Sequence, residues 1–418
     1  MPRVTIARAA GRLVRRLDDL GRVSDEPDRL ARTFLSPAMK RANALVAEWM
    51  KEAGLKVRQD AVGNLIGRVG GAGRGAKTLL LGSHLDTVLD AGRFDGALGV
   101  LLPIVALGEL RRRGVRLPFA VEVLGFSEEE GVRFASAYLG SKGFTGRLRA
   151  ADLKLRDARG ISVGETLARL SGQRSGRIAL PGAAHRRKDL LGYVEVHIEQ
   201  GPVLEARKLA VGVVSGIAGQ TRARLAFRGR AGHAGTTPMG LRRDALAGAA
   251  AFVLAAEACA RGDPSLVATV GSLLVSPGAS NVIPADAVLT LDVRHPRDPA
   301  RRQALRQLFA RARRIARERQ LTLEWRQTQD DDAVACSRPL TALLARSVRA
   351  QQGRSVELTS GAGHDGVVMS AMASIAMLFV RCRGGLSHHA DEYAAPADVE
   401  VALRVIVDFL ERLAATIA

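Results

Sequence analysis

Short apolar runs bounded by glycine or charged residues recur along the chain, and stretches with helical periodicity separate them. The runs are Thr78 to Gly82, Phe119 to Phe126, Gly192 to Val196 and Ala376 to Val380. Apolar runs this short are typical of buried strands. A helix with one apolar face is indicated from Ser36 and Pro37 to Gly54, and a buried helix over Val100 to Arg112. This alternation predicts an α/β domain in which helices cover a central mixed sheet.

The pattern changes near Gly216, where apolar and polar residues begin to alternate as in a strand with one exposed face. Further signals follow in the order helix, strand, strand, helix, strand: Arg242 to Ala260, Leu266 to Leu274, Ala287 to Arg294, Pro299 to Gln320 and Leu321 to Trp325. Such a set can form a separate α+β unit. We therefore expect a catalytic domain of residues 1–215 and 333–418, interrupted by an inserted α+β domain of residues 216–332.

The composition is that of a globular protein with more than one core. The 418 residues are 47% hydrophobic and 25% charged, and this length exceeds what one hydrophobic core usually serves. The formal net charge of +20 taken alone would favour a polyanion-binding protein. However, the arginines are scattered, and aromatic residues, which stack on bases, make up only 4% of the chain. We therefore expect no nucleic-acid partner.

The cysteines and the apolar runs indicate a cytoplasmic protein without a membrane partner. Cys259, Cys336 and Cys382 are far apart, odd in number and without CxxC spacing, so neither a disulfide framework nor a thiolate zinc site is expected. The first twenty residues lack the continuous apolar stretch of a signal peptide. The longest apolar run, Ala97 to Gly108, is too short to span a bilayer.

Acidic and histidine side chains gather where the predicted strands end. His84 and Asp86 follow one apolar run, and His197 ends another. Asp95 precedes an apolar helix, and the acids Glu128 to Glu130 follow a further strand. Open α/β sheets bind ligands at the carboxyl ends of their strands. Taken singly, each of these residues also has a structural explanation as a turn residue, a helix cap or part of a solvated loop.

A late histidine pair, His388 and His389, adds another imidazole in a glycine-rich segment. One aspartate, one glutamate and three imidazoles would make a ligand set for two borderline divalent ions such as Zn²⁺. The concentration of these residue types is therefore more informative than any single member.

Nine motifs then point to a known family. In this order, the chain contains GSHLDTV, FDGALGV, SEEEGVRF, VEVHIEQGPVLE, AGHAGTTPM, PGASNVIP, LDVRH, SGAGHDG and GLSHHADEY. Their order and spacing resemble the M20 metallopeptidase-like amidohydrolases. Within that family the motifs look most like the hydantoinase/carbamoylase group, which includes N-carbamoyl-L-amino-acid hydrolases, allantoate amidohydrolases and β-ureidopropionase-type enzymes. The resemblance spans Ser36 to the carboxyl terminus.

The resemblance implies a centre of two divalent ions, Zn²⁺ or else Mn²⁺, Co²⁺ or Ni²⁺. The implied metal ligands are His84, Asp95, Glu130, His197 and His388. Asp95 would bridge the two ions, Glu129 would be the general base, and Asp86 would hold His84 in place. The resemblance gives no role to Glu128 or His389.

The resemblance also implies substrate-binding residues. In the inserted domain, expected to be ferredoxin-like and to act as lid and dimerisation domain, His233 would reach the active site of the partner subunit in a homodimer and help to stabilise the oxyanion. Asn281 and Arg294 match substrate-binding positions, and a guanidinium can grip a carboxylate with two hydrogen bonds. Gln200 suits an uncharged ureido group, and His364, beside Asp365, would orient the substrate loop.

These features together predict an amidohydrolase that cleaves the terminal carbamoyl or ureido C–N bond of a small anionic ureido acid by a hydroxide bridging two metal ions. The sequence does not choose between an N-carbamoyl-L-amino acid and allantoate. An M20 aminoacylase or dipeptidase acting on N-acyl amino acids or dipeptides is the main alternative. A polyanion-binding protein and a catalytically inactive scaffold are further alternatives.

Overall fold

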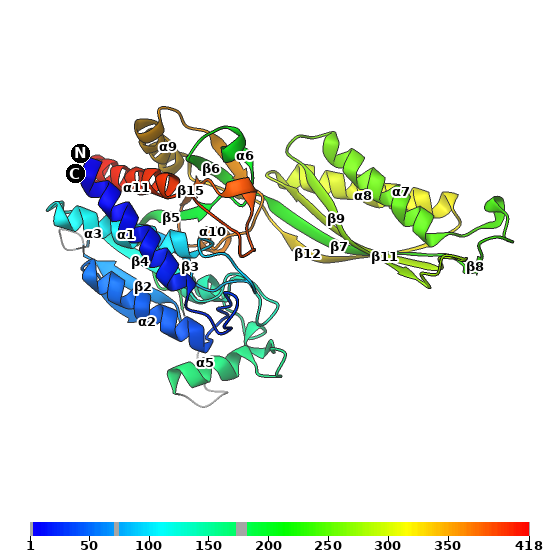
Figure 1. Cartoon of the computed structure of the whole chain (residues 1–418), viewed down its shortest axis with the longest axis horizontal. Helices are drawn as coiled ribbons and strands as arrows, with labels where there is room; N and C mark the ends of the chain where they lie inside the picture. Colours follow the sequence, from blue (N-terminus) through cyan, green and yellow to red (C-terminus); the bar gives the residue numbers. More distant parts are fainter. Residues whose placement is uncertain (1–2, 71–74, 173–181, 418) are drawn as a thin grey trace. The chain divides into compact units, whose positions relative to one another are not determined.

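The computed structural model describes residues 3–70, 75–172 and 182–417, and these form two compact units. Unit 1 consists of Met1–Ser215 and Ala335–Ala418, and unit 2 of Gly216–Val334. The insert that we expected at residues 216–332 thus continues to residue 334 in the structure. Figure 1 shows the helices and strands of both units.

Unit 1 is built on a mixed β-sheet with the strand order β1-β2-β4-β3-β5-β15-β6-β13, in which β14 also pairs with β6. Its strands are β1 (Lys56–Gln59), β2 (Leu65–Val69), β3 (Thr78–His84), β4 (Ala120–Phe126), β5 (Leu190–Ile198), β6 (Val211–Ile217), β13 (Val334–Ala335), β14 (Glu357–Ser360) and β15 (Ile375–Val380). β3 runs parallel to β4 and β5, and β15 runs parallel to β5, whereas β2 is antiparallel to β1 and β4, and β6 is antiparallel to β15. The predicted α/β fold with a central mixed sheet is confirmed, and β3, β4 and β5 end at the same edge of it.

Helices of unit 1 cover this sheet. They are α1 (Arg3–Gly21), α2 (Pro37–Glu52), α3 (Ala97–Arg112), α4 (Leu139–Phe144), α5 (Val163–Ser171), α6 (Val203–Ala206), α9 (Arg338–Gln352), α10 (Gly366–Met369) and α11 (Pro396–Ile417), with short 3₁₀ turns η1 (Asp152–Lys154), η2 (Arg187–Asp189) and η4 (Arg383–Gly385). A large core joins α1, α3, α9 and α11 to one face of β3, β5 and β15. On β5 this face presents Val194 and Val196. Because side chains alternate along a strand, His197 lies on the opposite face.

The predicted start of α2 is correct for a local reason. The side chain of Ser36 accepts a hydrogen bond from Met39 N, and Pro37 is the first helical residue. The helix stops before Gly54, whose φ of +90° is a conformation that suits glycine.

Unit 2 contains a four-stranded antiparallel sheet in the order β12-β7-β11-β9. Its elements are β7 (Gly219–Arg228), β8 (Gly232–His233), η3 (Met239–Leu241), α7 (Ala245–Arg261), β9 (Val267–Ser276), β10 (Val282–Ile283), β11 (Asp286–His295), α8 (Asp298–Glu318) and β12 (Thr322–Asp331). The chain order β7-α7-β9-β11-α8-β12 with this strand order is the ferredoxin-like arrangement. Both helices pack on one face of the sheet (Figure 1). α7 begins at Ala245 and not at Arg242, because the side chain of Asp244 caps it.

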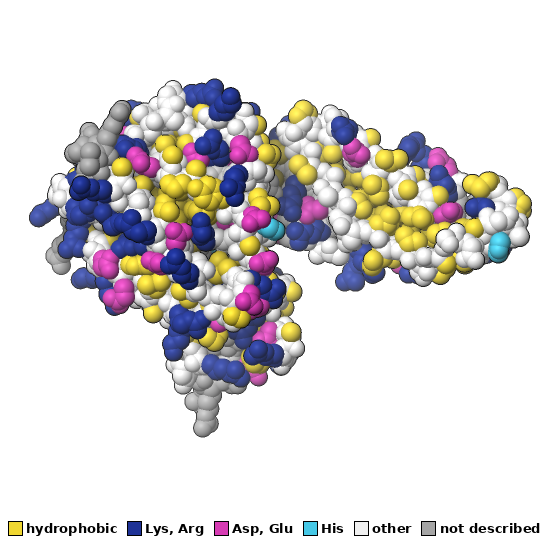
Figure 2. All heavy atoms as spheres, viewed as in Figure 1, with side chains coloured by type: hydrophobic (Ala, Val, Ile, Leu, Met, Phe, Trp, Pro, Cys, Tyr) yellow, Lys and Arg dark blue, Asp and Glu magenta, His cyan; other side chains and the backbone are white. Residues whose placement is uncertain are grey.

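The surface shows both signs of charge. On the face drawn in Figure 2, Lys and Arg side chains are spread over both units and lie among Asp and Glu side chains. In the described part of the chain, no helix combines the length and apolarity that crossing a membrane requires. The three cysteines are free thiols. The cytoplasmic location stays a prediction.

Candidate metal centre

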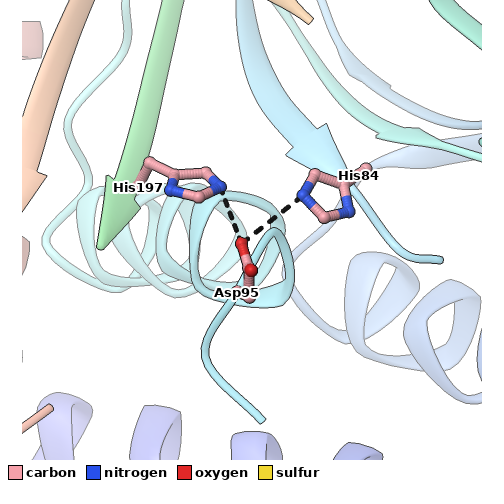
Figure 3. Close-up of side chains that lie close together, drawn as sticks. All are labelled: His84, Asp95 and His197. Carbon is pink, nitrogen blue, oxygen red and sulfur yellow. Dashed lines mark ion pairs between the residues drawn. The ribbon is translucent and has the colours of Figure 1, made fainter. Parts of the chain in front are cut away.

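Two histidines from neighbouring strands face one aspartate at the edge where the strands end. His84 is the last residue of β3, His197 is near the end of β5, and Asp95 lies in the loop before α3. His197 Nε2 is 3.0 Å and His84 Nε2 is 3.7 Å from Asp95 Oδ1. Figure 3 shows both rings turned toward this carboxylate. All three side chains are buried, with exposures of 2%, 2% and 5% for His84, His197 and Asp95.

A second group meets the other oxygen of the same carboxylate. His388 Nε2 lies 3.2 Å from Asp95 Oδ2 and 3.6 Å from Glu130 Oε1. The donor atoms of His84, Asp95 and His197 are mutually close enough to hold one ion, and so are those of Asp95, Glu130 and His388. The structure therefore brings together all five side chains expected to be metal ligands, with Asp95 shared by both groups.

The hydrogen bonds of the two buried rings indicate that a cation fits between them and Asp95. His84 Nδ1 is 2.9 Å from the carbonyl oxygen of Asp86, and His197 Nδ1 is 2.9 Å from that of Ile198. A carbonyl oxygen only accepts, so each Nδ1 carries the hydrogen, and in a neutral ring Nε2 points a lone pair at Asp95. Asp95 Oδ1 is buried and has no hydrogen-bond partner among the described residues. Buried lone pairs facing a carboxylate are stabilised by a positive ion.

The pKa shifts report a strong negative field in the same place. Burial alone would lower the pKa of His84, but Asp86 and Asp95 raise it well above its usual range. Burial alone would raise the pKa of Asp95, but His197, His388 and His84 hold it well below its usual range. The field that would retain a proton on these rings also attracts a divalent cation.

Two acids at the centre have raised pKa values: Glu129, and Glu130 of the second donor group. Burial raises the pKa of Glu129 well above its usual range, His84 opposes this shift, and Glu130 adds to it. Burial raises the pKa of Glu130 to about 7, with His84 opposing the shift and Asp95 adding to it. A carboxyl group with a raised pKa can take up and return a proton near neutral pH.

Asp86 organises the segment that carries these acids. Its Oδ1 and Oδ2 accept hydrogen bonds from Glu129 N at 2.9 and 3.1 Å, and Oδ2 also accepts from Glu130 N at 3.1 Å. The same carboxylate lies 3.4 Å from His84 Nδ1. Asp86 thus orients both a ring of the first group and the backbone of the acidic turn. Glu128 Oε1 accepts a hydrogen bond from Gly131 N at 2.6 Å, and burial, with the nearby charge of Asp86, raises the pKa of Glu128 well above its usual range.

Gln200 and His364 lie beside the donor groups. Gln200 Nε2 donates to Asp95 Oδ2 at 3.2 Å and to Ser387 Oγ at 3.1 Å, so its amide contacts the shared carboxylate. The His364 ring lies 4.4 Å from the His197 ring, centroid to centroid, and its Nε2 lies 2.8 Å from Ser360 Oγ. Burial lowers the pKa of His364 well below its usual range, which keeps the ring neutral near pH 7.

The neighbour of His388 has a different role. His389 Nδ1 accepts a hydrogen bond from Asp391 N at 3.1 Å. His389 belongs to none of the candidate ion-binding groups found among the described residues. Its contacts are those of a turn residue on the surface.

In unit 2 the structure places two of the three expected substrate residues together. β8 pairs with β10, where His233 lies opposite Val282, and Ala234 N donates to Asn281 O at 3.0 Å. The Asp286 end of β11 pairs with the end of β7 that leads into β8. Arg294 lies near the other end of β11, where its Nε and Nη2 donate to the Asp292 carboxylate at 2.9 Å. Arg294 is therefore far from His233 and Asn281 within one copy of unit 2.

Comparison with known proteins decides the family. The sequence profile of peptidase family M20/M25/M40 matches residues 80–412. This chain belongs to that family. The match confirms the family that the nine motifs predicted, and the expected enzyme class, a hydrolase of C–N bonds other than peptide bonds, is confirmed by relatives that carry amidohydrolase names.

Named relatives of this M20 family member cover nearly the whole chain. It is 40% identical to allantoate deiminase 2 of Glycine max over 96% of this chain and 89% of the relative. It is 40% identical to N-carbamoyl-L-amino acid amidohydrolase of Geobacillus stearothermophilus over 96% of this chain and 98% of the relative. The crystal structure of a hydantoinase/carbamoylase family amidase from Burkholderia multivorans matches with a TM-score of 0.90 at 33% identity, covering 96% of this chain and 97% of that one.

Sequence reasoning missed three residues beside the centre of this M20 enzyme. Glu195 is fully buried in β5, and its carboxylate accepts from Ser83 Oγ at 2.8 Å and from Gly366 N at 3.0 Å. Ser387 and Glu392 contact the shared aspartate and its backbone. Two signals were present: an acid inside an apolar run, two residues before His197, and polar residues in the same motif as His388.

Proposed function

We propose that this protein is a di-metal amidohydrolase that removes the terminal carbamoyl or ureido group of a small anionic ureido acid. The main support for this proposal is the Asp95 carboxylate, which presents one oxygen to each of two donor groups. Oδ1 lies 3.0 Å from His197 Nε2, and Oδ2 lies 3.2 Å from His388 Nε2. Relatives named allantoate deiminase and N-carbamoyl-L-amino acid amidohydrolase, each 40% identical, support this class of substrate. Either an N-carbamoyl-L-amino acid or allantoate would suit the residues at the centre.

The metal ions would be held by His84, Asp95 and His197 on one side and by Asp95, Glu130 and His388 on the other. Imidazole and carboxylate ligands suit Zn²⁺, which we favour, and they also suit Mn²⁺, Co²⁺ and Ni²⁺. When bound, two such ions would polarise the carbonyl group of the substrate and make a water molecule more acidic.

Glu129 is the proton carrier of this proposal. It is buried, its pKa is raised by that burial, and Asp86 fixes its backbone. Its carboxylate would take a proton from the water molecule whose oxygen attacks the carbonyl carbon, and would return it to the leaving nitrogen as the C–N bond breaks. Ammonia, carbon dioxide and an amino acid or ureido fragment would be the products.

Substrate recognition would come from both units. Arg294, oriented by two hydrogen bonds to Asp292, would grip the substrate carboxylate. His233 and Asn281, which lie together on the β8-β10 ribbon, would hold the substrate carbonyl oxygen as it becomes an anion. Gln200 and His364 would orient the ureido group beside Asp95. Unit 2 would then serve as a lid over the substrate.

The layout of unit 2 also supports a homodimer. Asp286 is the residue of β11 that pairs with the last residue of β7, Arg228. Arg294 lies eight residues further along β11, and eight residues of extended strand span about 27 Å. In Figure 1, β8 lies beyond the Asp286 end of β11. A small ureido acid cannot reach both Arg294 and His233 of one copy, so a second copy would supply His233 and Asn281. The edge strand β9 exposes Val267 and Leu274 and is our candidate for the contact between copies.

Ammonia release from a small panel of compounds tests the proposal. The purified protein, loaded with each metal in turn, is offered N-carbamoyl-L-amino acids, allantoate, N-acetyl amino acids and dipeptides. We expect ammonia from one of the first two classes and its loss after treatment with a chelator. Glu129→Gln should lower kcat about a thousandfold and retain both ions. Acetate or free amino acids from the last two classes, without ammonia from ureido compounds, would identify an aminoacylase or dipeptidase instead.

A further inference from the structure

A second set of hydrogen bonds ties the segment of His388 to the loop of Asp95. We infer that Ser387 and Glu392 are positioning residues that hold Asp95 and His388 together and thereby set the affinity for the ion on the His388 side. The inference rests on the proposed function in one respect, namely that Asp95 and His388 are metal ligands.

Glu392 holds the backbone of the shared ligand. Its side chain is 3% exposed, and Oε1 accepts hydrogen bonds from Phe94 N at 2.9 Å and from Asp95 N at 3.0 Å. These partners are 298 and 297 residues away along the chain. Hydrogen bonds from backbone N–H groups to a buried carboxylate are among the stronger ones in proteins. Glu392 therefore fixes where the Asp95 main chain lies.

Ser387 holds the carboxylate of the same ligand. Its Oγ lies 3.0 Å from Asp95 Oδ2 and 3.0 Å from Glu392 Oε2, and it accepts from Gln200 Nε2 at 3.1 Å. Asp95 Oδ2 is the oxygen that faces His388. His388 follows Ser387 directly in the chain. The Ser387 hydroxyl therefore links the segment that carries the His388 ring to Asp95 Oδ2, the oxygen that this ring faces.

Close packing reinforces these hydrogen bonds. A Cβ atom at Gly92 would come within 2.3 Å of Glu392 Cβ, so the loop before α3 lies directly against that side chain. The rings of Phe94 and Tyr393 meet edge to face with centroids 6.1 Å apart. Residues 92–95 and 387–393 thus form one packed unit, which we call the Glu392 clip.

The clip acts on the two candidate ions unequally. His84 and His197 stand on strands of the central sheet and are nearly fully buried. His388 stands on a loop, its side chain is 49% exposed, and its φ is +56°. Its placement depends on contacts such as the clip, because the sheet does not hold it. Loss of the clip should therefore weaken ion binding on the His388 side more than ion binding on the His197 side.

Cobalt titration of the full-length apoprotein tests the inference independently of turnover. Co²⁺ binding is followed by its absorption spectrum and by competition with a chelator of known affinity. Two reference variants identify the ions: His388→Ala should lose one and His197→Ala the other. The site that His388→Ala removes is the one to follow. We expect Ser387→Ala and Glu392→Ala to lower the Co²⁺ affinity of that site by about 10- to 100-fold, the usual effect of removing a residue that orients a ligand.

Glu392→Gln and Asp157→Ala are the matched controls. Glutamine can accept both backbone N–H groups through Oε1 and donate to Ser387 through Nε2, so we expect its Co²⁺ affinity within about threefold of wild type. Asp157 makes the same pattern of contacts elsewhere: Oδ1 accepts from Arg159 N and Ile161 N, and Oδ2 accepts from Arg133. Asp157→Ala should lower the melting temperature without changing Co²⁺ affinity.

The outcomes separate the two proposals. Wild-type protein that bound no Co²⁺ would overturn both the proposed function and the clip. Wild-type protein that bound two ions, with Glu392→Ala or Ser387→Ala unchanged, would overturn the clip alone. A loss as large in Glu392→Gln as in Glu392→Ala would also overturn it, since charge and not position would then be the role of Glu392. If Glu392→Ala does not fold, the smaller change Ser387→Ala decides the question.

Discussion

At the scale of single residues, two kinds of carboxylate shape the centre. Asp95 and Glu130 belong to the candidate ion-binding groups, whereas Asp86 and Glu392 accept hydrogen bonds from backbone N–H groups. Asp86 accepts from two successive N–H groups of the acidic turn, and Glu392 accepts from two at the Asp95 loop. Each fixes a short segment whose own side chains have a role in the proposed function. A substitution at either position therefore acts through geometry, and its effects should appear in metal affinity and kcat before they appear in KM.

One carboxylate away from the centre gives a pH prediction. Glu122 in β4 accepts from Arg68 Nη1 at 2.9 Å and lies 2.8 Å from His185 Nε2. Burial alone would raise the pKa of Glu122, but His185 and Arg68 lower it below its usual range. A lowered folded-state pKa gives stability that is complete above the pKa of the unfolded chain and is lost as the pH falls through the folded value.

We therefore expect Glu122→Gln to reduce the free energy of unfolding by about 2 kcal/mol at neutral pH, and the difference from wild type to shrink below about pH 4.5. Urea denaturation in the presence of a chelator, repeated at several pH values, measures this. Glu48→Gln, at an exposed carboxylate of α2 paired with Lys51, should change stability by less than about 0.5 kcal/mol. A deficit that stayed constant down to pH 3 would contradict the assignment.

At the scale of elements, the contact of α3 with the sheet places Asp95. Gly99 in the first turns of α3 lies so close to the sheet that a Cβ atom would come within 2.2 Å of Val196 O and 2.7 Å of Ser83 Cβ. The helix thereby rests on the ends of β3 and β5, beside both buried histidines, and the loop that enters it carries Asp95. A displaced α3 would move Asp95 away from the rings of His84 and His197.

Gly99→Ala should therefore destabilise the protein by about 3 kcal/mol through overpacking, and should weaken metal binding as well. Gly108 lies in the same helix, where the nearest atoms to an added Cβ would be Ala53 Cβ at 3.5 Å and Ala53 Cα at 3.7 Å, both ordinary contacts. Gly108→Ala should be neutral or stabilising by up to about 1 kcal/mol, because alanine favours the helix. Chemical denaturation and Co²⁺ titration of both variants measure these effects, and equal stabilities would show that α3 can shift without cost.

At the scale of the whole molecule, the proposed dimer predicts complementation between two inactive variants. Arg294→Ala and His233→Ala should each have little activity alone. Mixed under conditions that exchange subunits, they should recover about a quarter of the wild-type activity, because half of the dimers would be mixed and one site in each would be intact. Leu274→Arg on the β9 edge should yield monomers in sedimentation analysis. Mixtures as inactive as the separate variants would mean that both residues serve the same copy.

The amino-acid sequence determined those features of this protein that depend on local signals. The Ser36 cap and Gly54 stop predicted α2, the apolar runs predicted the buried strands, and the motifs predicted the family and the five clustered side chains. Such signals act over a few residues, so they are legible in the chain itself.

Only the tertiary structure decided which atoms meet. It placed the Gln200 amide against Asp95, tied Glu392 to a loop nearly three hundred residues away, and set Arg294 and His233 at opposite ends of unit 2. These contacts follow from strand order and from the packing of distant segments, and neither is encoded in the spacing of residues along the chain.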